Sequence, residues 1–137
     1  MLKFEPPVEL SDEIQVACLP PQSIDIPKRR GFNTTVYAVG WGVLNQTDNS
    51  VPNLLQNIAL TASDGFVYCD NWRLDYEDNF NWDILVCAGD LNGAKGVCFG
   101  DSGGSLYEYD ELENKYVAVA IVSFGENCVD NRFPSYL

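Results

Sequence analysis

From Thr34 onward, short apolar runs alternate with polar segments that contain Gly, Asn and Asp. The runs are rich in Val, Ile and Tyr and read TVYAVGW, LLQNIAL, ILVCAG, SLYEY and YVAVAIVSF. β-Branched and aromatic residues favour strands, whereas Gly, Asn and Asp favour the turns between them. The pattern therefore predicts an all-β domain over residues 34–137.

Residues 5–33 have a different composition. They lack sustained periodicity and contain five prolines, Pro6, Pro7, Pro20, Pro21 and Pro27. Proline removes a backbone donor and opposes regular strands and helices. We interpret residues 5–33 as an extended linker that lies along a surface and joins two bodies.

Two polar segments interrupt the strand pattern. The charged stretch Asp110–Lys115 separates SLYEY from YVAVAIVSF and is predicted to be a solvated hairpin turn without a function of its own. The stretch Ser63–Asp83 mixes aromatic and acidic residues. Its opening favours one short helix, capped by Ser63 with Asp64 near the positive end of the helix dipole. The remainder is expected to be a surface loop over tucked aromatic side chains.

Length, charge and composition narrow the class of protein. A chain of 137 residues corresponds to one domain or most of one. Its net charge of −12 repels phosphate backbones and anionic lipids, so we expect no nucleic-acid or membrane partner. A hydrophobic content of 46% is too high for a disordered acidic tail. No apolar run is long enough for a signal peptide or a membrane span, so any export signal must be encoded upstream.

Histidine and cysteine usage restricts the chemistry. The chain has no histidine, so it lacks the commonest metal ligand and the commonest general base. Its five cysteines lack the paired short spacings of a zinc site and fit disulfides with one cysteine left over. Disulfides persist in oxidising compartments, and the sequons Asn33-Thr34-Thr35 and Asn45-Gln46-Thr47 are compatible with secretion, although such triplets also occur by chance.

One segment, Gly96–Leu106, carries unusual chemistry because Ser102 stands among glycines in GDSGG. Glycine permits strained backbone and lets a substrate carbonyl approach a hydroxyl nucleophile. If the N–H groups of Gly100 and Ser102 converge, they can hold an oxyanion, a contribution of roughly 3–4 kcal/mol per donor. A glycine-rich turn with an idle serine explains the pentapeptide equally well.

The wider context resembles the chymotrypsin and trypsin family of serine proteases. Five blocks agree in order with that family: LKFEPPVELSDEIQVACLP, GWG, VCAGD, CFGDSGGSL, and VSFGENC followed by RFPSYL. The resemblance implies the second six-stranded Greek-key barrel of a two-barrel fold, incomplete at both ends. Residues 1–33 then hold the end of the first barrel and the interbarrel linker, and residues 34–137 the C-terminal barrel.

The resemblance also implies roles for single residues. Ser102 matches the catalytic nucleophile, Gly100 with Ser102 the oxyanion hole, and Asp101 the carboxylate that receives a new N-terminal ammonium on zymogen cleavage. The remaining matched positions line the primary specificity pocket and its substrate-binding wall: Gly96, Ser123, Phe124, Gly125 and Ser135. A neutral pocket floor at Gly96 argues against basic substrate side chains, so we expect the pocket to take an aromatic or medium apolar substrate residue.

The family template also implies a pairing of the cysteines. It pairs Cys69 with Cys87 and Cys98 with Cys128, whereas four cysteines by themselves permit three connectivities. Cys18 resembles a cysteine that, in some members, ties the domain to its propeptide, so its partner is expected outside this chain.

The resemblance implies a secreted serine endopeptidase that acts on protein or peptide substrates without cofactor or metal. The triad histidine and aspartate belong to the first barrel, so the chain as written is expected to be an inactive C-terminal fragment. Two alternatives stay open. One is a pseudoprotease that serves as a binding module. The other is a half-enzyme that regains activity when it docks with a separate first barrel.

Overall fold

Every regular element that the structure describes is a β-strand. The computed structural model describes residues 3–21, 33–44, 49–63, 69, 81, 84–90, 92, 94–125 and 128, and the backbone of 135–136. Its strands are β1 (Asn33–Gly40), β2 (Gln56–Ser63), β3 (Cys87–Gly89), β4 (Ser105–Asp110), β5 (Lys115–Ile121) and β6 (Ser135–Tyr136). Among these residues no helix is long and apolar enough to cross a membrane. The predicted all-β class is confirmed.

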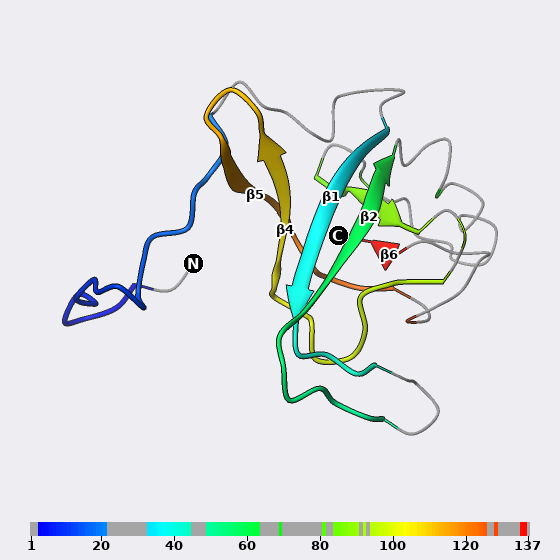
Figure 1. Ribbon diagram of the computed structural model, residues 1–137, viewed down its shortest axis with the longest axis horizontal. Helices are drawn as coiled ribbons and strands as arrows, with labels where there is room; N and C mark the ends of the chain where they lie inside the picture. The colour runs from blue at the N-terminus through cyan, green and yellow to red at the C-terminus, as the bar shows by residue number, and fades with distance from the viewer. Residues whose placement is uncertain are drawn as a thin grey trace.

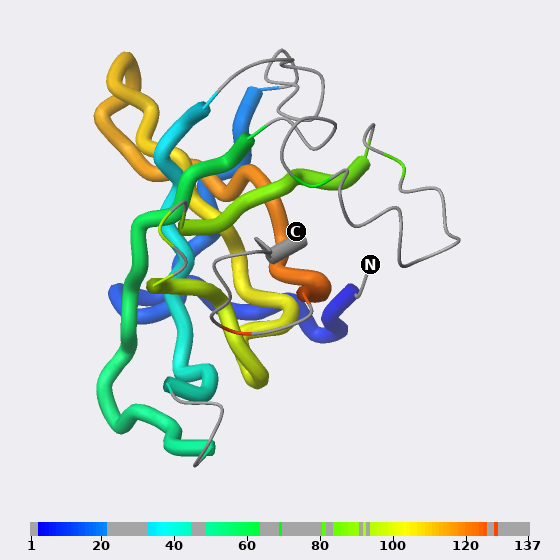
Figure 2. The backbone as a smooth tube through the Cα atoms, turned by 90° about the vertical axis from the view of Figure 1, so that its right-hand side faces the viewer, coloured from blue at the N-terminus to red at the C-terminus, as the bar shows by residue number. Residues whose placement is uncertain are grey.

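The six strands form one antiparallel sheet in the order β5-β4-β1-β2-β3-β6 (Figure 1). The longest pairing joins β1 to β2 over eight residues, from Asn33 opposite Ser63 to Gly40 opposite Gln56. On its other side β1 pairs with β4, although β2 and β3 intervene in the sequence. This arrangement is consistent with the partial chymotrypsin-like barrel that the resemblance implies. In both Figure 1 and Figure 2, the described parts of the connection from β1 to β2, residues 41–44 and 49–55, extend beyond the ends of these strands.

The core is built from small and medium apolar side chains on one face of the sheet. In β1, Val36 and Ala38 are buried while their neighbours are more exposed, which is the period of two that a strand with one buried face requires. The core cluster contains Val36, Ala38, Leu60, Ala62, Val86, Ala88, Val97, Leu106 and Val122. Because Val97 and Val122 belong to it, the two loops that flank Ser102 in space are anchored in the core.

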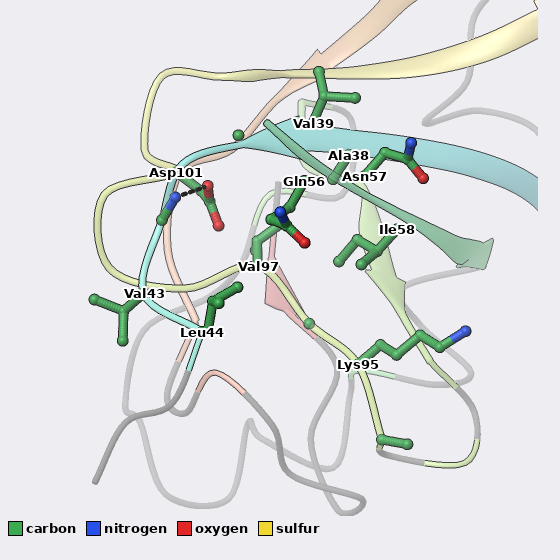
Figure 3. A pocket seen from close by; sticks show the side chains of 14 residues that line it. Ala38, Val39, Val43, Leu44, Gln56, Asn57, Ile58, Lys95, Val97 and Asp101 are labelled. Carbon is green, nitrogen blue, oxygen red and sulfur yellow. Dashed lines mark hydrogen bonds between the residues drawn. The ribbon is translucent and has the colours of Figure 1, made fainter. Parts of the chain in front are cut away.

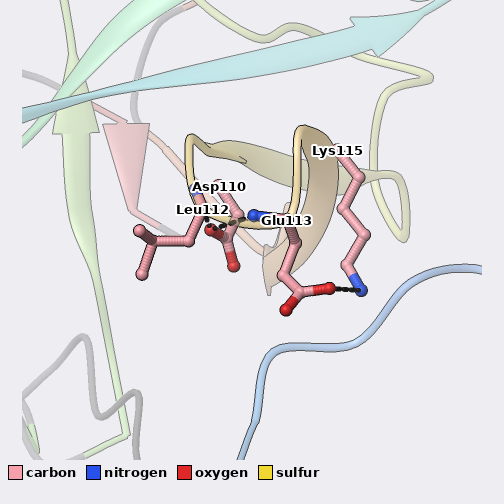
Figure 4. A network of polar contacts seen from close by, with 4 residues as sticks. All are labelled: Asp110, Leu112, Glu113 and Lys115. Carbon is pink, nitrogen blue, oxygen red and sulfur yellow. Dashed lines mark hydrogen bonds and ion pairs between the residues drawn. The ribbon is translucent and has the colours of Figure 1, made fainter.

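The predicted hairpin turn lies between β4 and β5 (Figure 4). The Asp110 carboxylate accepts hydrogen bonds from the N–H groups of Leu112 and Glu113 at 2.9 and 3.1 Å. The Lys115 Nζ atom lies 3.6 Å from Glu113 Oε2 in an exposed ion pair. The Leu112 side chain at the turn is 96% exposed. Asp110 and Lys115 themselves end the two strands, so the turn is shorter than the charged stretch. Its exposure agrees with a solvated turn.

One strand boundary differs from the sequence pattern, and one predicted helix lies outside the described residues. The run ILVCAG predicts a strand from Ile84, but β3 begins at Cys87 and Ile84 is 74% exposed. β3 pairs with β2 only from Cys87, which lies opposite Ser63. Apolar character alone therefore did not show where the pairing of β3 begins. The short helix predicted after Ser63 lies outside the described residues, and Ser63 itself is the last residue of β2.

The arm, residues 3–21, contains no strand and extends away from the sheet (Figure 1). Its larger apolar side chains are about half to three-quarters exposed: Phe4, Val8, Leu10, Ile14, Val16 and Leu19. Among the described residues, one backbone hydrogen bond joins it to the sheet, from the Ala118 N–H to the Cys18 carbonyl at 2.8 Å. Most of the described arm is thus exposed, and the expectation that the linker lies along a surface between two bodies stays a prediction.

Candidate active site

A tight turn presents Ser102 at the surface. Ser102 is exposed and lies between Gly100, with φ of 97°, and Gly103, with φ of 83°. Both angles are in the left-handed region that glycine adopts without steric cost. Two backbone hydrogen bonds close the turn: the Asp101 N–H donates to the Cys98 carbonyl at 3.0 Å, and the Gly104 N–H donates to the Asp101 carbonyl at 2.9 Å. The sequence GDSGG thus forms a turn whose positive φ angles fall on glycines and whose serine faces solvent.

Two backbone N–H groups of this turn have no acceptor among the described residues, namely those of Gly100 and Ser102. The amides of Asp101, Gly103 and Gly104 are all bonded. Unpaired N–H groups beside an exposed hydroxyl are available to a substrate oxygen. Both N–H groups are therefore free of intramolecular bonds to the described residues, on the same turn as the exposed Ser102.

The segment after β5 is tied directly to this turn. The Gly103 N–H donates to the Val122 carbonyl at 2.9 Å, and the Val122 N–H donates to the Gly104 carbonyl at 2.8 Å. Val122 is buried and anchors the connection, whereas the next three residues, Ser123, Phe124 and Gly125, are exposed. The structure thus brings this predicted substrate-binding wall together with the predicted nucleophile turn.

The Asp101 carboxylate links the turn to the end of β1. Its Oδ1 accepts a hydrogen bond from the Gly42 N–H at 2.9 Å, and its Oδ2 accepts one from the Cys98 N–H at 2.9 Å. A side chain at Gly40 or Gly42 would collide with this carboxylate. The turn is held further by the Val43 N–H, which donates to the Phe99 carbonyl at 2.8 Å.

These contacts explain the GWG motif in physical terms. Sequence reasoning used Gly40-Trp41-Gly42 only as a family marker and missed that both glycines make room for Asp101. The available signal was the spacing of two glycines around a bulky residue, which indicates a close approach of the backbone to another group.

A cavity of about 180 Å³ lies next to Asp101 (Figure 3). Its walls come from the end of β1, the start of β2 and the segments 42–44 and 94–97. Ala38, Val43, Leu44, Ile58 and Val97 make much of the wall apolar, and the Asp101 carboxylate supplies a negative charge. Gly96 also lines this cavity, whereas Ser102 does not.

The loop that leads to Gly96 is organised by Asp90. The Asn92 N–H donates to Asp90 at 3.2 Å and lowers the pKa of this carboxyl below its ordinary value, which desolvation partly opposes. The Ala94 N–H at 3.0 Å and the charge of Lys95 lower the pKa further. Among the described residues, no three His, Cys, Asp or Glu side chains come together as a metal site.

The cysteines pair as the family template implies. Disulfides join Cys69 to Cys87 and Cys98 to Cys128, which confirms both expectations. The second bridge starts at the residue whose N–H bonds Asp101, so it restrains the nucleophile turn directly. Cys18 is exposed and forms no disulfide within this chain. Ser135 pairs with Ala88 through β6 and β3, and its side chain lies outside the description.

An all-β sheet, a glycine-framed serine turn and a disulfide that starts at this turn are together typical of serine proteases. The family model described as Trypsin matches residues 1–137. The chain belongs to the trypsin family of serine peptidases. Domains of this family and disulfides are typical of extracellular proteins.

Proposed function

We propose that this chain supplies the nucleophilic half of a serine endopeptidase that works through an acyl-enzyme. The observation that carries the proposal is the exposed Ser102 hydroxyl beside two N–H groups, of Gly100 and Ser102, that have no acceptor among the described residues. Such donors stabilise the developing oxyanion of a tetrahedral intermediate more strongly than the ground-state carbonyl.

In the proposed reaction, Ser102 Oγ forms a bond to the substrate carbonyl carbon as its proton passes to a general base. The carbon–nitrogen bond then breaks, and the amine leaves with that proton. Water hydrolyses the ester that remains on Ser102. A serine hydroxyl near its ordinary pKa is a poor nucleophile without such a base.

The general base has to come from other polypeptide, because these 137 residues contain no histidine. We therefore expect the isolated chain to be inactive as a peptidase, since loss of the base reduces turnover by several orders of magnitude. The triad histidine and its orienting aspartate would be supplied by a first barrel.

Asp101 is proposed to receive the ammonium of a new N-terminus when a precursor is cleaved. Two features support this role: the carboxylate already accepts two backbone N–H groups, and the neighbouring cavity has apolar walls suited to an aliphatic first residue. An ammonium would pair with this part-buried carboxylate and add a restraint to the turn that carries Ser102.

Substrate binding is proposed at the exposed segment Ser123, Phe124 and Gly125, which the Val122 bonds hold beside the turn. Extended peptides pair with such backbone as an added strand. We further propose that Gly96 forms the floor of the primary specificity pocket and Ser135 its side, as the family resemblance implies, and we then expect an aromatic or medium apolar residue before the scissile bond.

The absence of histidine favours a second candidate, a pseudoprotease that uses the same fold as a binding module. The binding-module hypothesis and the peptidase hypothesis predict different behaviour of the isolated chain in solution. A binding module should be a soluble monomer that melts cooperatively. A half of a peptidase should aggregate through its exposed apolar arm unless the first barrel is added.

A fluorophosphonate probe tests the proposal. We expect no labelling of the isolated chain and labelling once a histidine-bearing first barrel is linked or docked. Ser102→Ala should abolish labelling, and Ser105→Ala, three residues away on β4, should retain it. Absence of labelling in the combined protein, while its disulfides and melting remain intact, would favour the binding module. Labelling that survives Ser102→Ala would overturn the assignment of the nucleophile.

A further inference from the structure

Asn33 opens β1 on the solvent-facing side of the sheet. In the alternation of this strand, Asn33 and Thr35 are exposed, whereas Val36 and Ala38 on the other face are buried. Asn33 and Thr35 are the first and third residues of an Asn-x-Thr sequon. Because side chains two apart share one face of a strand, the acceptor amide and the hydroxyl point the same way.

The amide of Asn33 is already oriented. Ser63 lies opposite Asn33 in the β1–β2 ladder, and its hydroxyl donates a hydrogen bond to Asn33 Oδ1 at 2.9 Å. Ser63 is 5% exposed, so this bond is partly shielded from water. Oδ1 is therefore occupied, and the Nδ2 group makes no hydrogen bond to any described residue.

We infer that Asn33 is a glycan acceptor and that the folded sheet accommodates the modified side chain. Asn-x-Thr is the acceptor sequence for N-linked oligosaccharides, which are bulky and require surface positions. The inference rests on the proposed passage through the secretory route, which the two disulfides support. It does not depend on catalysis.

The covalent step is a glycosyl transfer from a lipid diphosphate-linked oligosaccharide. Nδ2 of Asn33 forms a bond to C1 of the first sugar, and the bond from C1 to the diphosphate oxygen breaks. The diphosphate leaves with the electron pair, and Nδ2 loses one of its two hydrogens as a proton. Oδ1 remains a carbonyl oxygen, so the hydrogen bond from Ser63 survives the modification.

The position of Asn33 keeps a glycan away from the candidate active site. Asn33 and Gly40 stand at opposite ends of β1, about 23 Å apart along an extended strand. Gly40 is the end that meets Asp101. A glycan on Asn33 is therefore attached at the far end of the strand from the Ser102 turn.

The test is expression behind a cleavable signal peptide in insect cells, with the chain recovered from both medium and membranes. The background is Asn45→Gln, which removes the other sequon. We expect a mobility shift that peptide N-glycosidase removes, and deglycosylation in heavy-oxygen water should mark residue 33 by mass spectrometry. Added Asn33→Gln or Thr35→Ala should abolish the shift, whereas Thr35→Ser, which preserves the sequon, should retain it.

An unmodified Asn33 in chain recovered from the membranes overturns the inference. So does a glycan found only on chain whose disulfides have not formed, because the folded sheet would then exclude it. Since the signal peptide supplies entry to the secretory route and no activity is read, failure here is distinct from failure of the probe experiment on Ser102.

Discussion

The nucleophile turn and the arm show two ways in which this chain meets solvent. The turn is exposed at Ser102, yet it is held by backbone hydrogen bonds, by the bonds that the Asp101 carboxylate accepts and by the Cys98–Cys128 disulfide. The arm contains more apolar residues and is exposed almost throughout, with Cys18 as its backbone link to the sheet. Apolar content therefore does not bury a segment unless a partner surface receives it, whereas a few long-range polar contacts hold an exposed glycine turn in place.

The disulfide should contribute most to this difference. Replacing both Cys98 and Cys128 by Ser opens a loop of 30-residue separation. The chain-entropy relation predicts a loss of roughly 3–4 kcal/mol in the free energy of unfolding. Urea denaturation measures it, with Cys18→Ser as the control, for which a change within about 0.5 kcal/mol is expected at an exposed free cysteine. Equal effects of the two replacements would contradict the special role of the turn.

The carboxylate of Asp101 comes next. Asp101→Asn replaces one acceptor oxygen of the carboxylate by an NH2 group. One of the two backbone N–H groups that now donate to Asp101, that of Gly42 or that of Cys98, then loses its acceptor. Leaving a part-buried N–H unpaired should cost about 2 kcal/mol. The matched control is Asp110→Asn, because Asp110 also accepts two N–H groups but in an exposed turn, so a loss below about 1 kcal/mol is expected. Chemical denaturation of both variants compares them, and an equal loss would break the distinction.

Alanine substitutions at Gly103 and Gly104 distinguish two causes of destabilisation, steric crowding and an unfavourable φ angle. A Cβ at Gly104 would lie 2.9 Å from the Asp101 carbonyl oxygen, whereas a Cβ at Gly103 meets nothing within 4 Å but requires a φ of 83°. We expect Gly104→Ala to destabilise by about 2 kcal/mol and Gly103→Ala by about 1 kcal/mol. Thermal unfolding gives the order, and the reverse order would show that crowding at Gly104 is relieved by movement of the turn.

Asp90 gives a smaller, pH-dependent effect. Its pKa is lower in the folded chain than in the unfolded chain, so its ionised form adds stability above the unfolded value. That stability is lost as the pH falls through the lower, folded pKa. Asp90→Asn should therefore lower the melting temperature slightly at neutral pH and not at all well below pH 3.8, the ordinary value. A difference that stays constant with pH would contradict this origin.

The arm should give the smallest effect. Val16→Ser and Ile14→Ser change side chains that are 74% and 49% exposed, so we expect changes within about 0.5 kcal/mol in this chain. Val36→Ala, at a fully buried position of β1, should cost about 2 kcal/mol and is the comparison. A large loss from the arm variants would mean that the arm packs on the sheet after all. Addition of a first barrel should make the arm positions sensitive.

Much of the fold could be predicted from local pattern. The apolar runs located β1, β2, β4 and β5 to within a few residues, because alternation and turn residues are local properties. The start of β3 at Cys87 could not be predicted from the apolar run that begins at Ile84. A strand extends only as far as its pairing partner does, and β2 ends at Ser63, opposite Cys87. The neighbour relation between β1 and β4 likewise depends on how the whole chain closes.

The same division holds at the candidate site. The sequence by itself determined that a serine stands in a turn with glycines on both sides, because these glycines permit positive φ angles wherever the segment lies. It could not determine that Asp101 meets Gly42, 59 positions earlier, or that Val122 accepts from Gly103. Only the tertiary structure decided which amides stay unpaired beside Ser102, because a hydrogen bond between distant segments exists only once the sheet brings both backbones to one place.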